Sequence, residues 1–207
     1  MSDLVSDTAS DIATVKTVGI DQFIHDLRSF PADDFANHVA SYVKTHRLDR
    51  ASLERYAFFF PNRYTRNLIF RDETFEALAL CWEPGQVSNV HNHRGQECCV
   101  VVAEGELRSQ TYYVHDRDEG AGTCRLEEGP LEAITREQPG IVDLDAPVHQ
   151  VRNPGESRAL SVHVYSKPFD TCEVYCPVKG TYHEVKLHDF SQYGELTQQP
   201  AQDPCGE

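Results

Sequence analysis

The hydrophobic pattern divides the chain into a helical part and a longer β-rich part. Between residues 20 and 60, apolar residues recur three and four positions apart, which is the period of an amphipathic helix. A Phe30-Pro31 pair interrupts this pattern, because proline cannot continue a helix. We therefore expect an N-terminal helical segment over about residues 18–60. Its apolar stripes are Ile20, Phe23, Ile24 and Leu27; Phe35, Val39, Tyr42 and Val43; and Leu53, Tyr56 and Ala57.

After Asn62, short β-rich segments alternate with Gly, Pro, Asn and Asp. Many short strands at this spacing predict an antiparallel sandwich or barrel over about residues 61–190. The first 17 residues and a tail at about 194–207 are polar, and we expect them to be loose. The predicted strands are 64–70, 74–82, 90–93, 97–103, 106–114, 123–127, 131–136, 141–144, 148–152, 158–165, 172–176 and 182–186.

Composition excludes some classes of partner. A length of 207 residues suits one domain, here 1–207, with a sizeable core. The net charge of -14 argues against nucleic acid or an anionic membrane as the main partner, because both are polyanions. Seven cysteines without a disulfide framework fit a reducing compartment, which predicts a cytoplasmic protein. The N-terminus lacks the pattern of a secretory signal, and no apolar run approaches the ~20 residues of a membrane span.

The segment His91-Asn92-His93 is the first candidate for chemistry. Two histidines two apart on a strand point to the same face, about 6–7 Å apart, and both imidazoles can reach one metal ion. His149, on a distant predicted strand, would be the third ligand. The ordinary alternatives are polar residues on a solvated strand and a structural histidine. A three-histidine site also suits Zn, Ni or Mn as well as iron, so the residues alone leave the metal open.

A second candidate is the strictly alternating segment that contains Ser161, His163 and Tyr165. These three side chains share one face of a strand and could form a hydrogen-bonded relay. The alternative is an edge strand whose polar face lies in water. Arg66 carries a planar fork suited to a carboxylate, although a lone arginine is most often a surface residue.

Taken together, these motifs resemble the cupin superfamily and, within it, the cysteine dioxygenase family. The resemblance covers roughly residues 55 to 190 and rests on several motifs in one order. It implies a mainly β, jelly-roll-like barrel or sandwich. The motifs are the glycine-to-glycine stretch 85–105, RYTRNL at 63–68, CW at 81–82, HNH at 91–93, HQVRN at 149–153, SVHVYS at 161–166 and PFDTC at 168–172.

The resemblance also implies an activity, in which Fe(II) and O2 convert L-cysteine to cysteine sulfinic acid. We expect a monomer. Related enzymes that prefer 3-mercaptopropionate carry glutamine at the position of Arg66, so the arginine favours L-cysteine. Dioxygenation of another small thiol, or a non-catalytic cupin that binds metal or a small ligand, stays as an alternative. The implied roles are iron ligation by His91, His93 and His149, carboxylate binding by Arg66 with Tyr64, and placement of Tyr165 beside the iron by Ser161 and His163.

Two neighbouring residues, Glu97 and Cys98, are candidates for the position beside the metal that follows the histidine pair. Many cupins have a metal-binding glutamate five residues after the second histidine, where animal cysteine dioxygenases have a cysteine that becomes bonded to the tyrosine ring. Cys98 holds that place here, and the resemblance implies a bond to Tyr165. On a regular strand, however, Glu97 would share the face of His93 and be a rival fourth ligand. A bulge at Gly95 would reverse this. A small buried hydrophobe is the ordinary alternative for Cys98.

Overall fold

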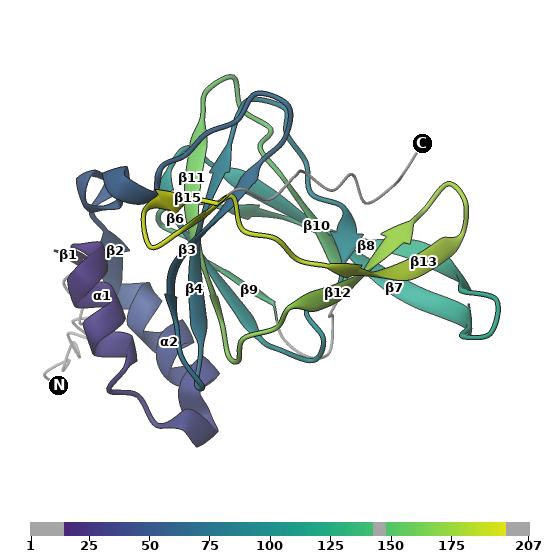
Figure 1. Cartoon of the computed structure of the whole chain (residues 1–207), viewed down its shortest axis with the longest axis horizontal. Helices are drawn as coiled ribbons and strands as arrows, with labels where there is room; N and C mark the ends of the chain where they lie inside the picture. Colours follow the sequence, from purple (N-terminus) through teal and green to yellow (C-terminus); the bar gives the residue numbers. More distant parts are fainter. Residues whose placement is uncertain (1–14, 143–147, 198–207) are drawn as a thin grey trace, which may run out of the picture.

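The computed structural model describes residues 15–142 and 148–197. Their main feature is a pair of β-sheets packed face to face, with helices on the outer face of one of them (Figure 1). The first sheet has seven strands, in the spatial order β15 (Glu195–Leu196), β14 (Ser191–Gln192), β3 (Thr65–Arg71), β4 (Glu76–Trp82), β11 (Ala159–Tyr165), β6 (Cys98–Glu104) and β9 (Gly140–Val142). The second closes on itself in the order β10 (His149–Arg152), β5 (Val90–His91), β12 (Thr171–Cys176), β13 (Thr181–Lys186), β8 (Thr123–Ile134) and β7 (Leu107–Asp118).

The helical layer buries the apolar stripes that the sequence predicted. Phe23, Val39 and Leu53 pack against Ala79 and Val162, which lie on the outer face of the first sheet. Figure 1 shows α1 and α2 together on this side of the molecule. The layer consists of β1 (Lys16–Val18), α1 (Ile20–Leu27), the 3-10 helix η1 (Ala32–Asp34), α2 (Phe35–Thr45), β2 (His46–Leu48) and the 3-10 helix η2 (Arg50–Tyr56), with β1 and β2 paired in parallel.

The second core lies between the two sheets. Leu78 and Val100 of the first sheet meet Leu107 and Val151 of the second, in one buried cluster with Tyr165. Strand β11 lies between β4 and β6, which pair with both of its edges, and its two faces contribute to the two cores, so all its residues are buried. The alternative of an edge strand in water is therefore wrong.

The expected mainly β architecture with an N-terminal helical segment is confirmed, with differences in individual elements. The predicted strands 123–127 and 131–136 are one strand, because β8 stays paired with β7 through register shifts. The predicted strand 90–93 is only the two residues of β5. Part of the expected tail is ordered, since β15 pairs with β14, while 198–207 lie outside the described residues. No helix in the described part of the chain is long and apolar enough to cross a membrane.

Candidate metal centre and adjoining pocket

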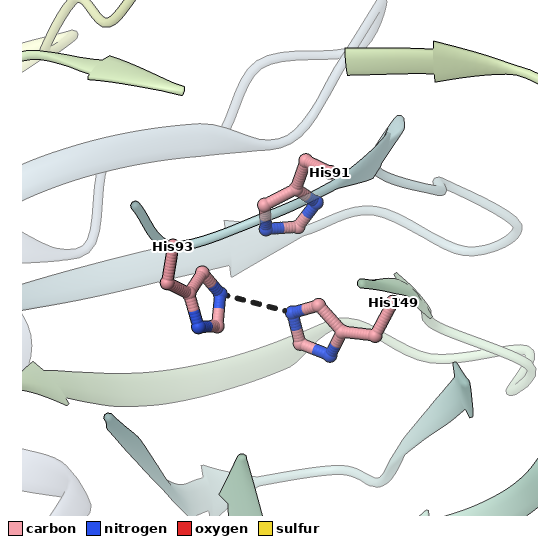
Figure 2. A group of neighbouring side chains, drawn as sticks. All are labelled: His91, His93 and His149. Carbon is pink, nitrogen blue, oxygen red and sulfur yellow. Dashed lines mark hydrogen bonds between the residues drawn. The ribbon is translucent and has the colours of Figure 1, made fainter. Parts of the chain in front are cut away.

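Strand pairing brings two of the candidate histidines together. His91 is the last residue of β5, and His149 is the first of β10, directly opposite it in the antiparallel pair. Directly opposite residues have Cβ atoms about 4.5–5.5 Å apart. His93 follows two residues after His91, and its ring turns toward the same space (Figure 2).

The three imidazoles form a compact group. One ring nitrogen from each of His91, His93 and His149 lies within 4.8 Å of the other two. The Nε2 atoms of His93 and His149 are 3.1 Å apart, as the dashed line in Figure 2 marks. Among the residues that the structure describes, this is the one cluster of three or more His, Cys, Asp or Glu side chains close enough to share a metal ion.

Hydrogen bonds on the outer side orient two of these rings. His91 Nδ1 donates to the Asn89 carbonyl at 2.8 Å, which leaves Nε2 as its free nitrogen. Ser109 Oγ lies 2.9 Å from His149 Nδ1 and holds the orientation of that ring. The buried Nδ1 of His93 has no hydrogen-bond partner among the described residues. Such second contacts fix which nitrogen a histidine offers to a metal.

Burial keeps these rings neutral. It lowers the pKa of His91 to about 4, although the hydrogen bond to Asn89 acts in the opposite direction. Burial, with the other histidines, holds the pKa values of His93 and His149 well below the ordinary range. A neutral imidazole has the lone pair that a metal needs. The donor set therefore fits a divalent cation such as Fe(II) or Zn(II), and does not by itself choose between them.

Glu173 of β12, which forms an ion pair with Arg117 of β7, holds Asn92 between the two histidines. Asn92 Nδ2 donates to Glu173 Oε2 at 2.8 Å, and the Glu173 N–H donates to Asn92 Oδ1 at 2.9 Å. Glu173 also accepts two bonds from Arg117, at 3.0 and 2.7 Å, and one from the Tyr175 hydroxyl at 2.8 Å. Since β5 ends at His91, these contacts continue the support of the chain up to His93. We call Asn92, Glu173, Arg117 and Tyr175 the Asn92 clamp.

A turn, rather than a bulge within a strand, separates the histidines from β6. Arg94 and Gly95 both have positive φ, 54° and 76°, and reverse the chain there. As a result Cys98 faces the core between the sheets and Cys99 faces the helical layer. Glu97 is half-buried, its N–H donates to Ser166 Oγ, and it does not belong to the metal-binding group.

Cys98 and Tyr165 lie directly opposite each other on β6 and β11. The two side chains are within hydrogen-bonding reach, and burial raises both pKa values well above the ordinary range, so the thiol and the phenol stay protonated. The ring of Tyr165 lies 5.3 Å from that of His93, between centroids. The phenol therefore lies beside the metal-binding group.

The first link of the expected relay is present. His163 Nε2 lies 3.0 Å from Ser161 Oγ, which also accepts a bond from the Trp82 indole at 3.2 Å. The other ring nitrogen lies 4.0 Å from Cys98 Sγ. Within the described part of the chain, no hydrogen bond joins His163 to the hydroxyl of Tyr165, and the ring centroids are 6.3 Å apart. The second ring nitrogen of His163 therefore faces the cysteine, and the expected hydrogen bond to the tyrosine hydroxyl is not formed.

A pocket of about 570 Å³ opens beside the histidines and is lined by His91, Tyr165 and Phe169. Arg66 and Tyr64 line another wall. The side chain of Arg66 is 13% exposed, and its buried Nε has no hydrogen-bond partner among the described residues. Tyr64 stacks on Trp82 with ring centroids 4.4 Å apart. The pocket can therefore take a small ligand with an anionic group.

Residues 4–177 match the family model described as "Cysteine dioxygenase type I". The chain belongs to this family. Cysteine dioxygenase type 1 of Danio rerio is 26% identical over 187 residues, 88% of this chain and 92% of that protein. The human protein of the same name is 26% identical and covers 85% of this chain and 86% of its own length. The Bos taurus protein is 28% identical over 77% of this chain and 78% of its own length.

The architecture of this cysteine dioxygenase family member is mostly β, with a short N-terminal helical segment. Among solved structures, the protein TT1209 from Thermus thermophilus is 23% identical over 56% of this chain and 93% of its own, with a TM-score of 0.41. Oxalate oxidase in complex with glycolate is 15% identical over 54% of this chain and 55% of its own, with a TM-score of 0.40. Likeness of this degree adds nothing about the site.

Sequence reasoning did not find several residues that surround the histidines. The other members of the Asn92 clamp lie on β12 and β7, and Ser109 lies on β7, so no local spacing connects them with the motif. Asp189, which also lines the pocket, lies in the loop after β13. These residues become neighbours only through sheet pairing and the path of the chain across the pocket.

Proposed function

We propose that this chain is a non-haem Fe(II) thiol dioxygenase that converts L-cysteine and O2 to cysteine sulfinic acid. One observation carries the proposal. Three neutral histidines, the buried His93 and His149 and the half-buried His91, meet beside a pocket that Arg66 also lines, and Nε of Arg66 has no hydrogen-bond partner in the described part of the chain. The membership of the cysteine dioxygenase family supports the same reaction. A cytoplasmic location and a monomeric state stay predictions.

In this proposal, His91, His93 and His149 hold the iron. The chemistry that bound Fe(II) supplies is the addition of both atoms of O2 to the substrate sulfur. Three neutral ligands leave the full charge of the metal in place, which favours an anionic fourth ligand such as a substrate thiolate. The protein orients two of the rings, His91 through the Asn89 carbonyl and His149 through the Ser109 hydroxyl, and the carbonyl leaves the lone pair of His91 on Nε2 before a metal arrives.

Arg66 would bind the substrate carboxylate, with Tyr64 beside it on the pocket wall. A guanidinium offers a planar fork that matches a carboxylate, and the low exposure of Arg66 strengthens such a contact. The stacking of Tyr64 on Trp82 limits the movement of its ring. This pair would set the length of substrate that fits between the carboxylate site and the metal.

Tyr165 would place a protonated phenol beside the reacting sulfur, and Ser161 and His163 would act as positioning residues through the contact of His163 with Cys98 and its packing beside the tyrosine ring. We also propose that Cys98 Sγ can become bonded to the ring of Tyr165. Formation of this thioether removes one hydrogen from the thiol and one from the ring, and O2 is the oxidant that takes the two electrons. Their pairing across β6 and β11 supports this proposal.

The decisive experiment loads the protein with Fe(II) under argon and then follows O2 consumption and product formation. L-Cysteine, 3-mercaptopropionate and cysteamine are compared, and the same protein loaded with Zn(II) is the control. We expect the highest kcat/KM with L-cysteine and cysteine sulfinic acid as the product. A higher kcat/KM with 3-mercaptopropionate than with L-cysteine would show that the alternative substrate, 3-mercaptopropionate, is the correct one. Metal binding without O2 consumption from any of the three thiols would indicate a non-catalytic cupin.

A further inference from the structure

The loop after β13 lines the pocket beside Arg66. This loop lies beyond residue 177, where the family match ends. The backbone N–H of Phe190 donates to the carbonyl of Arg66 at 2.7 Å, which fixes the loop beside β3. Asp189 and Phe190 both line the pocket. The side chain of Asp189 is therefore held close to that of Arg66.

The two side chains are paired by charge but do not share a hydrogen bond. Arg66 Nε lies 3.8 Å from Asp189 Oδ1, beyond hydrogen-bond distance, and each side chain is 13% exposed. The other oxygen of Asp189 accepts a bond from Gln192 Nε2 at 3.1 Å, which fixes the orientation of the carboxylate. Asp189 thus opposes the charge of Arg66 while the guanidinium stays available to a ligand.

A second carboxylate lies near the same guanidinium. Glu76 is 2% exposed, interacts electrostatically with Arg66, and pairs with Arg71 at 3.5 Å. Glu76 has Arg71 as a partner, whereas within the described residues Asp189 has no cation closer than Arg66. The charge of Asp189 is therefore less neutralised by neighbouring cations than that of Glu76, and it acts more strongly on a ligand bound at Arg66.

We propose that Asp189 is a specificity-determining residue that makes the pocket select ligands by net charge. The inference rests on the proposed function, because it assumes that the ligand's carboxylate meets Arg66. A carboxylate placed there is also within a few ångströms of Asp189, and like charges at that distance repel. Ligands without a positive charge experience this repulsion in full. A zwitterion such as L-cysteine experiences less of it, because its ammonium group is attracted to Asp189.

Two other cations line the pocket and would attract the anionic ligands that Asp189 repels. Arg63 and Lys186 are on its walls, but Lys186 is exposed and Arg63 is half-buried. Water and salt screen charges at such positions. The less exposed pair of Arg66 and Asp189 therefore dominates the preference for ligand charge.

The test measures dissociation constants by calorimetry on the Fe(II)-loaded protein under argon. The probes are 3-mercaptopropionate, L-cysteine and cysteamine, whose net charges with a neutral thiol are negative, zero and positive. Asp189→Asn keeps the shape and the acceptor for Gln192 but removes the charge. The control Asp116→Asn removes the same charge from an exposed residue on β7, where a φ of 50° suits asparagine equally well.

In Asp189→Asn, we expect 3-mercaptopropionate to bind about tenfold more tightly relative to cysteamine, with L-cysteine between them. Asp116→Asn should leave these ratios unchanged, and Asp189→Glu, which keeps the charge, should stay close to wild type. A shift smaller than about threefold in Asp189→Asn overturns the inference. An equal shift in Asp189→Glu overturns it too, because shape rather than charge would then be responsible.

This result is separable from the proposed function. If the wild-type protein consumes no O2 with any thiol, while the affinity ratios still respond to Asp189→Asn, the dioxygenase proposal fails and the role of Asp189 stands. If O2 is consumed and the ratios do not respond, the role of Asp189 fails alone.

Discussion

The Asn92 clamp offers the sharpest test of how the histidines are held. Replacing Glu173 by glutamine keeps the shape of the side chain and removes its charge. One oxygen can still accept from Asn92, but the new NH2 group cannot accept from Arg117 and instead faces a donor. The position of His93 then depends on a weaker contact, because β5 ends two residues earlier.

The size of the effect follows from the bonds that change. Glu173 accepts two charge-assisted bonds from Arg117 and one bond each from Asn92 and Tyr175. A hydrogen bond to a charged group contributes about 1.5–3 kcal/mol, and the glutamine loses one or two of them. The Arg117 side chain is 34% exposed, so water compensates part of the loss. We expect the free energy of unfolding to fall by about 1–3 kcal/mol and Fe(II) affinity to fall about tenfold.

The assay combines urea unfolding of the metal-free protein with competition for Fe(II) against a chromophoric chelator under argon. Glu184→Gln is the matched control. Glu184 lies directly opposite Glu173 on β13 and pairs with Arg94, but its side chain is 55% exposed, so its loss should cost about 0–1 kcal/mol. Equal effects of the two variants on both measurements would refute the reasoning.

The pH dependence gives an independent check. The bond from Arg117 is the main reason that the pKa of Glu173 lies below its ordinary value, although burial acts in the opposite direction. The stabilisation is therefore complete above the ordinary pKa of about 4.3 and is lost as pH falls through the lowered value. The difference in unfolding free energy between wild type and Glu173→Gln should be largest near neutral pH and shrink below about pH 4. A constant difference down to about pH 3 would show that charge is not the cause.

Three further predictions concern the proposed reaction. His149→Ala should lose bound iron and turnover while unfolding at nearly the same urea concentration as the metal-free wild type; full iron content and activity in this variant would remove it from the ligand set. Arg66→Gln should reduce kcat/KM most for L-cysteine and least for cysteamine. For L-cysteine the reduction should correspond to a loss of about 2–5 kcal/mol of binding free energy in the transition state, as for other desolvated charged pairs. Equal losses for both thiols would show that the arginine has a structural role. After aerobic turnover with L-cysteine, peptide mass spectrometry should find Cys98 linked to Tyr165 with the loss of two hydrogens, and Cys98→Ser should lack the link yet retain some activity. No linked peptide after many turnovers, or attachment of Cys99 instead, would disprove the thioether.

Much of the fold could be predicted because its signals are local. The strict alternation in Ser161–Tyr165 and the punctuation by Gly, Pro and Asn repeat over short stretches, and β11 follows from them almost residue for residue. The histidine pair is also local, since two residues on one strand share a face. His149 could be added because it stood on a predicted strand of a chain whose other motifs resembled one family.

Tertiary structure alone decided how these pieces meet. The direction of Cys98 depends on the turn at Arg94 and Gly95. This turn changes which face of β6 each side chain occupies relative to His93, and alternation along the sequence does not reveal it. The full burial of β11 depends on its central place between β4 and β6 and on the layers that cover both faces of the sheet, and alternation is the same for an edge strand and a central one. Glu173 and Asp189 look like ordinary acidic residues in the sequence. Their partners, Asn92 and Arg66, are distant along the chain, and a hydrogen bond or an ion pair between distant residues leaves no periodic trace in either segment.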